Sequence, residues 1–411
     1  MPQTSETKFK ETEIGTIPDD WKILPLDDLA IVKSGKRLPK GEQLVQENTG
    51  FPYIRITDIT DSKIDINNLQ YLTPEIREKI KRYIITSEDI FLSIVGTIGL
   101  VGIIPKELIN PNLTENCVRL TGLKINQLYL KYFLISSYGQ NQIRQLTVGS
   151  TQGKLAIHRI KQIQIPFPSP SEQEIIANIL LTLDEKIEIL QRQNKILEEM
   201  GQVIFKKWFI DEKRDEWEIS RIGKEFRTIL GGTPSRSNKD YWNGTISWIN
   251  SGAINEFPIM NYTERITEDG LKNSAASPMP RGTIVLPFVI SLSKEIKISV
   301  LGIESSGNQS VLGILPNENF SSAYIYYWIQ NIKADIYSWA TGGAQQHINK
   351  KNVDDSALLI PDKEMLNKFN LIGQDIFNKI LNNSEQIKSL LKLRDSLLPK
   401  LMSGKIRAPI K

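Results

Sequence analysis

The sequence has few of the residues from which disulfide frameworks and zinc sites are built. Its 411 residues include one cysteine, Cys117, and two histidines, His158 and His347. A single cysteine excludes an internal disulfide framework and is typical of proteins from reducing compartments. The polar stretch at 1–13 lacks the apolar centre of a signal peptide, and the most apolar run, at 94–104, is far shorter than the roughly 18 residues of a membrane span. We therefore expect a cytoplasmic protein with no membrane segment and no metal site.

The sequence also lacks the motifs that accompany nucleotide binding and catalysis. The segment GSTQGKL at 149–155 differs from a phosphate-binding loop, because it has three residues between the glycines instead of four and ends in Leu155 where Ser or Thr would bind magnesium. No GxGxxG turn follows a strand, and no Asn-Pro-Pro-aromatic or Asp-Pro-Pro-aromatic string is present. Neither histidine has a recognisable triad around it. We predict no catalytic residue and no cofactor bound by this chain.

The sequence does contain an internal duplication. Trp21 and Gly35 match Trp217 and Gly231, and both pairs are 196 residues apart. Further on, YIRITDI, which starts at Tyr53, matches WINSGAI, and KYFLI matches YYWIQ. Because solenoid repeats are far shorter, we interpret this repeat as a duplicated domain.

Both copies show short Ile-, Val-, Tyr- and Phe-rich runs broken by Gly, Pro and Asn, a pattern typical of strands. The expected strands are Tyr53–Ile59, Ile90–Val95, Ile246–Ile249, Ile284–Ile290 and Ile296–Leu301. The expected helices are Pro74–Tyr83, Gln127–Leu146 and Ser321–Thr341. Each copy is therefore predicted to be an α+β domain.

Each copy ends in a long segment with apolar residues at alternating steps of three and four. Ser171 with Glu174 predicts a capping box for the first helix, and Asp362 predicts the N-cap of the second. Such seams predict coiled-coil helices, with two ordinary core helices as the alternative. The central seam positions are Leu183, Ile187, Leu190, Asn194 and Leu197, and Ile376, Ile380, Asn383, Ile387 and Leu390.

An antiparallel pairing with matched ends gives a specific register. It sets Asn194 opposite Asn383, Gly201 opposite Ile376, and Arg394 opposite Leu183 with its charged end turned outward. A seam of about 33 residues is roughly 50 Å long, or about 15 base pairs of duplex. Two similar domains held at a fixed separation suit a bipartite DNA site.

The net charge of +4 is compatible with nucleic acid without demanding it. Candidate DNA contacts recur at matched places in the two copies, where polar and cationic side chains could contact phosphates or base edges. Solvated basic loops and caps of strands or helices are the alternative roles. The candidates in the first copy are Lys36, Arg37, Arg55, Thr57, Asp58, Ser150, Thr151, Gln152 and Lys154. Those in the second are Arg236, Lys239, Asn250, Ser251, Gln345, Gln346 and His347.

Four segments resemble the specificity subunits of type I restriction-modification systems. They are IGTIPDDW at 14–21, the long segment at 149–180, IFKKWFID at 204–211 and LLPKLMSGKI at 397–406. The resemblance covers nearly the whole chain. It implies target recognition domains at 1–170 and 211–361, and two antiparallel spacer helices at 171–210 and 362–404.

The resemblance also implies the partners of the chain. These would be double-stranded DNA, two methylation subunits that use S-adenosylmethionine, and restriction subunits that use ATP and magnesium. Catalysis would belong to those partners. A coiled-coil scaffold with protein- or carbohydrate-binding heads is the alternative, and the recurring basic loops disfavour it. A self-contained enzyme is disfavoured by the missing motifs.

Overall fold

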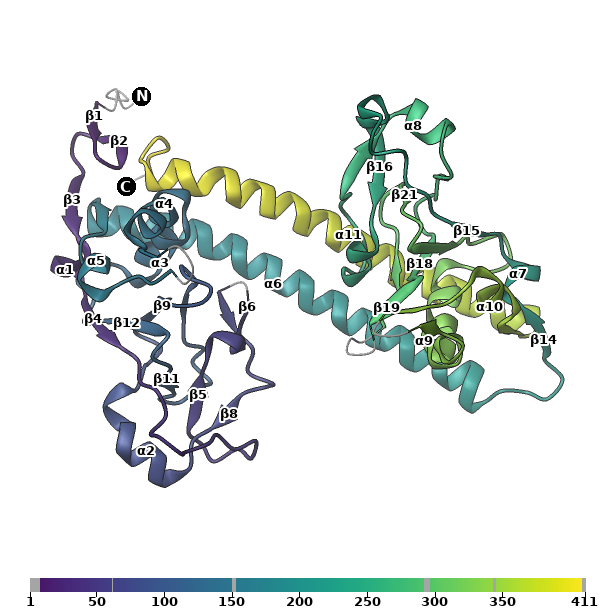
Figure 1. The fold of residues 1–411 in the computed structure, drawn as a ribbon, viewed down its shortest axis with the longest axis horizontal. Coiled ribbons are helices and arrows are strands. Elements are labelled where there is room, and N and C mark those ends of the chain that lie inside the picture. Colours follow the sequence, from purple (N-terminus) through teal and green to yellow (C-terminus); the bar gives the residue numbers. More distant parts are fainter. Residues whose placement is uncertain (1–7, 61, 150–152, 292–295, 343–344, 409–411) are drawn as a thin grey trace. The chain divides into compact units, whose positions relative to one another are not determined.

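The computed structural model describes residues 8–60, 62–149, 153–291, 296–342 and 345–408. It divides into two compact units, residues 1–185 with 391–411 and residues 186–390. Each unit contains part of the two long helices, α6 (Pro170–Lys206) and α11 (Lys363–Met402) (Figure 1). None of the helices in these ranges is both long and apolar enough to cross a bilayer.

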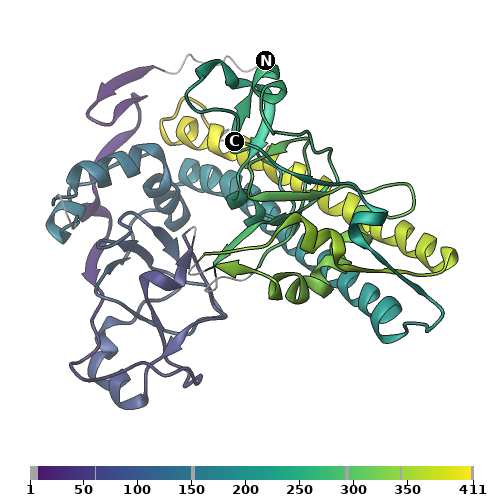
Figure 2. The same cartoon turned by 45° about the vertical axis from the view of Figure 1, so that its right-hand side comes forward.

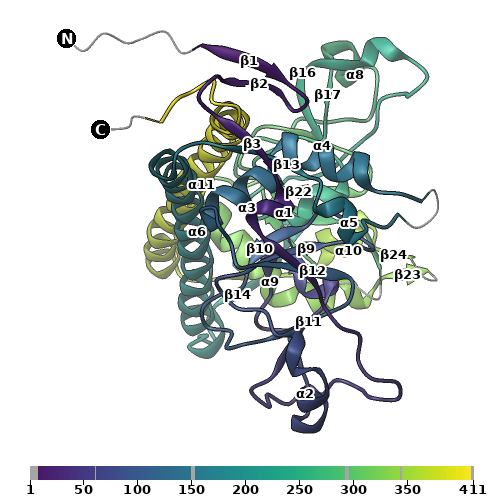
Figure 3. The same cartoon turned by 90° about the vertical axis from the view of Figure 1, so that its left-hand side faces the viewer.

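Unit 1 is built on a four-stranded and a three-stranded sheet (Figure 3). The four-stranded sheet has the order β10 (Val101–Ile103), β9 (Ile90–Ser93), β12 (Cys117–Thr121), β4 (Ile31–Ser34). The three-stranded sheet has the order β11 (Asn112–Leu113), β5 (Pro52–Ile54), β8 (Gln70–Tyr71). Three strand pairs complete the β-structure, namely β1 (Phe9–Thr12) with β2 (Gly15–Pro18), β3 (Lys22–Pro25) with β13 (Gln164–Phe167), and β6 (Ile59–Thr60) with β7 (Lys63–Ile64). The shorter helices are α1 (Leu26–Leu29), α2 (Pro74–Ile80), α3 (Gln127–Ile135), α4 (Ser137–Leu146) and α5 (Ile157–Ile160).

Unit 2 repeats this arrangement. Its four-stranded sheet has the order β20 (Ser299–Val300), β18 (Ile284–Pro287), β22 (Val311–Ile314), β15 (Thr228–Leu230). Its first three-stranded sheet has the order β21 (Ser306–Gly307), β16 (Trp242–Ile249), β17 (Glu264–Ile266). A second has the order β19 (Val289–Ser291), β24 (Gln345–His347), β23 (Thr341–Gly342), and β14 (Glu218–Arg221) pairs with β25 (Ala357–Ile360). The helices are α7 (Ile222–Glu225), α8 (Glu268–Lys272), α9 (Ser322–Ser338) and α10 (Lys350–Asp355).

The two units share one strand order. Taken in chain order, the strands of each four-stranded sheet correspond one to one, and so do those of the first three-stranded sheets. In both three-stranded sheets one neighbour of the central strand is parallel and the other antiparallel. The predicted α+β class and internal duplication are therefore confirmed.

Several predicted elements are shorter than expected because polar side chains end them. The strand expected at Tyr53–Ile59 stops at Ile54, and Arg55 and Asp58 then cap a 3₁₀ turn. The helix expected at Gln127–Leu146 breaks at Ser136, whose Oγ accepts a hydrogen bond from the Gly139 backbone and starts α4. Local side-chain bonds of this kind compete with continued helix or sheet.

Apolar side chains of each unit pack into a large core, which contains α3 in unit 1 and α9 in unit 2. In unit 1, Tyr129, Tyr132 and Phe133 of α3 are fully buried. In unit 2, Phe205 and Phe209 are fully buried against Tyr324 of α9, with ring centroids 5.5 and 5.2 Å away. The aromatic residues at the end of α6 therefore belong to the core of a globular unit.

The two long helices begin at different kinds of cap. Helix α6 starts at Pro170, and Ser169 Oγ accepts from the Glu172 backbone at 3.3 Å. The capping box predicted at Ser171 is therefore wrong by two residues, because Pro170 occupies the first helical position. The predicted cap of α11 is confirmed, since Asp362 Oδ1 accepts from the Met365 backbone at 2.9 Å.

Within unit 2, α6 and α11 run side by side and antiparallel (Figures 1 and 2). Asn383 Nδ2 donates to Asn194 Oδ1 at 2.9 Å, and Asn194 Nδ2 donates to Ser384 Oγ at 3.0 Å. The predicted asparagine register is confirmed. The buried Asn383 amide and the half-buried Asn194 amide oppose slippage of the helices, because a shift would break the hydrogen bond between them.

Two other details of the predicted seam need correction. Arg394 does not extend past Leu183 into solvent, because its Nη1 bonds Asp184 Oδ1 at 3.0 Å within unit 1. Gly201 does not serve to admit Ile376. A Cβ at Gly201 would lie 2.0 Å from the Tyr327 hydroxyl on α9, so the glycine lets a core helix approach α6.

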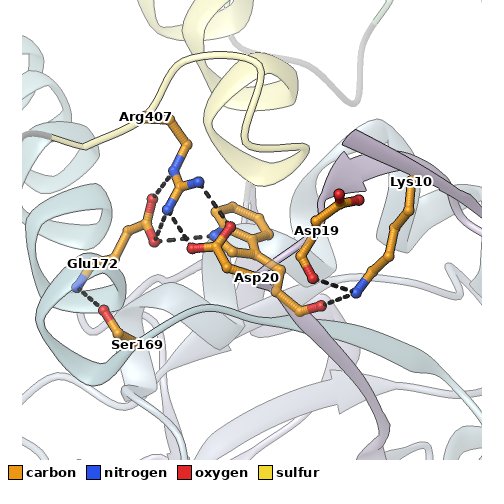
Figure 4. A network of polar contacts seen from close by, with 7 residues as sticks. Lys10, Asp19, Asp20, Ser169, Glu172 and Arg407 are labelled. Carbon is orange, nitrogen blue, oxygen red and sulfur yellow. Dashed lines mark hydrogen bonds and ion pairs between the residues drawn. The ribbon is translucent and has the colours of Figure 1, made fainter. Parts of the chain in front are cut away.

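The segment after α11 contacts the N-terminal part of unit 1 (Figure 4). Arg407 Nε donates to Glu172 Oε1 at 2.8 Å, and its Nη1 and Nη2 bond the Asp20 carboxylate at 2.9 and 2.8 Å. Trp21 Nε1 donates to Glu172 Oε2 at 3.0 Å. Glu172 is only 1% exposed, so these donors compensate a buried charge.

Unit 2 has a matching but more exposed contact. Trp217 Nε1 donates to Asp362 Oδ2 at 3.2 Å, and Arg214 Nη1 bonds the same oxygen at 3.1 Å. Each repeat therefore fastens its first tryptophan to the start of the following long helix through a carboxylate and an arginine.

Candidate nucleic-acid interface

The strand directions bring the predicted loops after β4 and β5 to one edge of the sheets of unit 1, where β9 also ends. Strands β4 and β9 are both antiparallel to β12, so both end where β12 begins. Strand β5 is parallel to β11, which leads into the loop before β12. We call the ends of β4, β5 and β9 together with the β11–β12 loop the loop edge. It collects residues that are far apart in the sequence.

Unit 2 forms the same loop edge with the same backbone bonds. Gly35 N donates to Cys117 O and Gly231 N to Val311 O, both at 2.9 Å. The next amides, of Lys36 and Gly232, donate to Leu113 O and Gly307 O, both at 2.8 Å. These hydrogen-bonded pairs follow the repeat spacing, so the two edges are structurally equivalent.

Glycine is required at the first position of each edge. A Cβ at Gly35 would lie 1.9 Å from Thr114 O, and one at Gly231 would lie 2.2 Å from Asn308 O. The loops after β4 and β15 therefore press against the loops that enter β12 and β22. This contact brings side chains from both loops together at the surface.

The two cations predicted after β4 lie on this edge. Lys36 is exposed, and its Nζ lies 5.6 Å from the centroid of the Tyr83 ring. Arg37 is 80% exposed in its side chain, and its Nε donates to Glu115 Oε1 at 2.7 Å. Partial burial is the largest single influence on Glu115 and opposes its ionisation, but the hydrogen bonds from Arg37, the backbone and Thr114 together with the charge of Arg37 outweigh it, so the pKa of Glu115 lies below its ordinary value.

The cation predicted in the first loop of unit 2 is held by an aromatic ring and a carboxylate. The Arg236 guanidinium carbon lies 3.6 Å from the Trp242 ring centroid, and Nη1 and Nη2 bond Glu264 at 2.6 and 2.8 Å. These bonds lower the pKa of Glu264. Lys239, also predicted, is exposed in a 3₁₀ turn.

In the second predicted group of unit 1, the role predicted for Asp58 is wrong. Asp58 is 5% exposed, and its Oδ2 accepts from the Arg55 backbone at 2.8 Å while its Oδ1 bonds Arg55 Nη2 at 2.7 Å. Asp58 therefore caps the end of β5 and is not placed to contact a base. Arg55 is half-buried in this pair and also bonds Gln70, whereas Thr57 is exposed.

The equivalent group of unit 2 has a similar cap. Asn250 Oδ1 accepts from the Gly252 backbone at 2.9 Å, which starts the 3₁₀ turn that contains Ser251. The oxygen of Asn250 is thus engaged in the fold. Both Asn250 and Ser251 are half-buried.

The third predicted group follows α4 in unit 1 and α9 in unit 2. Ser150, Thr151 and Gln152 lie outside the described residues. Lys154 is exposed and its backbone bridges Val95 and Val148. In unit 2, Gln345, Gln346 and His347 form β24, which pairs with β19, and His347 is exposed.

Sequence reasoning missed the partners of the loop cations and one further hydrogen-bonded pair. Glu115, Glu264, Thr233 and Gln309 were not predicted, although Glu115 and Gln309 occupy equivalent positions of the repeat. The repeat spacing could have revealed these two residues. The match between the two copies could have been extended from the strands to the loops between them. Among the described residues, no group of three or more His, Cys, Asp or Glu could hold a metal ion.

Two equivalent α+β units, each with an edge of exposed polar side chains and each containing part of the same antiparallel helix pair, define a duplicated protein with two long coiled-coil helices. The chain belongs to the type I restriction-modification DNA specificity family. The family model, described as the Type I restriction modification DNA specificity domain, matches residues 18–199 and again residues 214–393. The protein is thus a specificity subunit with two target recognition domains, and specificity subunits are not catalytic.

Relatives from two organisms match over nearly their full length. The chain is 26% identical to the type I restriction enzyme MjaIX specificity subunit of Methanocaldococcus jannaschii, over 98% of this chain and 97% of the relative. It is 23% identical to the HindI specificity subunit of Haemophilus influenzae, over 94% and 100%. The crystal structure of the type I S subunit from M. genitalium has a similar fold, with a TM-score of 0.58 and 18% identity over 97% of this chain and 99% of that one.

Proposed function

We propose that this chain selects the DNA target of a type I restriction-modification complex. Each recognition domain reads one half of a bipartite double-stranded site, and the α6–α11 pair sets the gap between the halves. Two methylation subunits dock on these helices and supply S-adenosylmethionine chemistry, while restriction subunits supply ATP- and magnesium-dependent cleavage. The domains correspond to residues 1–170 and 211–361, and the spacer helices to 171–210 and 362–404. We also place the chain in the cytoplasm, where a complex that acts on DNA would operate.

One observation carries this proposal: equivalent loop edges present different side chains. Unit 1 offers Lys36 and Arg37 where unit 2 offers Gly232 and Thr233. A constant backbone with exchanged polar groups is what two readers of different half-sites require, because base edges are distinguished by their donors and acceptors. A symmetric scaffold for one repeated ligand would need the same groups twice.

The direct test is to express the chain with its methylation subunit in a host that lacks DNA methylation. Mapping N6-methyladenine across the genome should give a split motif with a constant gap. Absence of sequence-dependent methylation, despite a stable complex that binds S-adenosylmethionine, would contradict the proposed function.

The spacer role predicts a longer gap when both helices grow together. One heptad inserted after Leu190 in α6 and one before Ile387 in α11 enter at the same level of the asparagine register. Seven residues add about 10 Å, or roughly 3 base pairs, and keep the seam in phase. The methylated motif should keep both half-sequences and widen its gap. An insertion in α6 alone serves as control and should abolish methylation, and an unchanged gap in the double insertion would refute the ruler.

A second heptad seam on α6 supports docking of a partner helix. Ile189, Ile196, Met200 and Val203 follow steps of three and four with Gln193, yet the four apolar residues are 48–68% exposed. This seam is shifted by two residues from the buried one at Ile187, which places it about 200° around the helix. A regular apolar stripe of this kind, opposite the α11 contact, suits a helix of another chain.

The docking surface predicts a selective loss of assembly. Ile196→Lys places a charge in the centre of the exposed seam and should leave the melting temperature within about 2 °C, because the residue is already solvated. Co-purification of the methylation subunit should fall at least tenfold. The control is Leu371→Lys, which changes an exposed leucine of α11 outside this seam. Equal behaviour of the two variants would exclude the seam as the docking site.

A further inference from the structure

The two loop edges contain one pair of surface side chains at matched backbone positions. In unit 1, Arg37 follows Gly35 by two residues and bonds Glu115, the middle residue of the β11–β12 loop. In unit 2, Thr233 follows Gly231 by two residues and donates from Oγ1 to Gln309 Oε1 at 2.6 Å. Gln309 is the middle residue of the β21–β22 loop. The backbone bonds of both glycines establish that the positions correspond.

The pair in unit 1 holds an arginine with its terminal nitrogens outward. Glu115 binds Nε of Arg37 through Oε1, and its Oε2 accepts from Thr114 Oγ1 at 3.2 Å, so the carboxylate is itself fixed. The described residues make no hydrogen bond to Nη1 or Nη2 of Arg37. Two parallel N–H donors on an exposed, anchored guanidinium match the O6 and N7 acceptors of guanine.

The pair in unit 2 holds a neutral amide. Thr233 occupies one lone pair of Gln309 Oε1, which leaves the second lone pair and the Nε2 donors of an exposed side chain. One acceptor beside one donor matches the N6 and N7 groups of adenine. The two edges therefore present complementary patterns to different base pairs from the same place on the fold.

We propose that residues 37 and 115 in unit 1 and residues 233 and 309 in unit 2 are equivalent specificity-determining pairs. The Arg37–Glu115 pair selects a G·C base pair in one half-site, and the Thr233–Gln309 pair selects an A·T base pair at the corresponding position of the other. This inference depends on the proposed function and adds the chemical identity of one base pair in each half.

The experiment uses the complete chain with its methylation subunits and maps N6-methyladenine in cells. The double variant Arg37→Thr/Glu115→Gln should exchange one G·C for A·T, or lose the preference there, while the second half-site and the gap stay unchanged. Arg37→Lys keeps the charge but removes the two parallel N–H donors of the guanidinium. It should lower discrimination at that base pair about 5- to 150-fold, measured by competition between duplexes that differ only there. Gln309→Glu should alter one A·T position of the second half alone.

The matched control removes another ion pair of the same strand region. Lys161 and Asp27 bond at 2.9 Å beside the start of β4, at the end opposite Arg37. Lys161→Thr/Asp27→Gln should leave the motif unchanged. If the double variant at 37 and 115 does not assemble, Arg37→Lys carries the test. A split motif that is identical in wild type, Arg37→Lys and Gln309→Glu would overturn this inference while preserving the proposed function, whereas the absence of any motif in wild type would instead refute the function.

Discussion

Replacing Arg407 with alanine is expected to lower the free energy of unfolding of unit 1 by about 2–3 kcal/mol. The variant leaves the Glu172 carboxylate buried with Trp21 as its remaining side-chain donor. Removing one partner of a buried charge costs more than the pair contributes, because the remaining charge loses solvent and partner together. Chemical denaturation of the full chain, with hydrogen exchange at the start of α6 to locate the effect, measures the loss.

The equivalent arginine of unit 2 is the control. Arg214→Ala removes a pair whose side chains are 50% and 39% exposed, so its cost should stay below about 1 kcal/mol. Equal losses in both variants would contradict the role of burial.

Acid should weaken the same contact between Arg407 and Asp20 and lower the free energy of unfolding. The hydrogen bond from Arg407 lowers the pKa of Asp20, so its stabilisation is complete above the unfolded pKa near 3.9 and is lost as the pH falls through the folded pKa. This acid-dependent part should be missing from Arg407→Ala.

Replacing Gly201 with alanine is expected to destabilise unit 2 by about 2–3 kcal/mol. Alanine in place of glycine inside a helix normally stabilises by about 1 kcal/mol, so the predicted sign is reversed. The reason is overpacking, because the new Cβ would lie 2.0 Å from the Tyr327 hydroxyl and 2.5 Å from its Cζ, and Tyr327 is fully buried. Denaturant unfolding at constant m-value would quantify the change.

A double-mutant cycle tests whether Tyr327 causes this effect. Gly201→Ala should cost far less in a Tyr327→Leu background, which gives a coupling energy of at least 1 kcal/mol. Asn382→Ala, at an exposed position of α11, is the helix control and should change stability by less than about 0.5 kcal/mol. A stabilising Gly201→Ala would show that α9 does not press on α6 as the structure indicates.

Periodicity predicted the helices and their register well, because the seam depends on residues a few positions apart. The coincidence of Asn194 with Asn383 could be found by counting along two segments. The glycine of the same seam could not be interpreted in this way. Gly201 faces Tyr327, which belongs to a helix more than 120 residues later, and no local pattern announces that contact.

The candidate site was predicted in part for a similar reason. Loop composition identified Arg37 and Arg236 as surface cations, but it could not distinguish Thr57, which is exposed, from Asp58 beside it, which is buried. Both are short polar residues at the end of a strand. The tertiary structure distinguishes them: Asp58 bonds Arg55 and caps the strand, whereas Thr57 is exposed and available to contact DNA.

The sequence by itself determined that the chain is duplicated, that each copy is α+β, and that each ends in a helix with a coiled-coil seam. These features are repeated or periodic, so they are visible along one dimension. The tertiary structure decided which polar groups meet across the loop edge, including Arg37 with Glu115 and Thr233 with Gln309. Such pairs arise because parallel and antiparallel strands bring distant loops to one edge, and the free energy of a contact depends on that distance in space, not on separation in the chain.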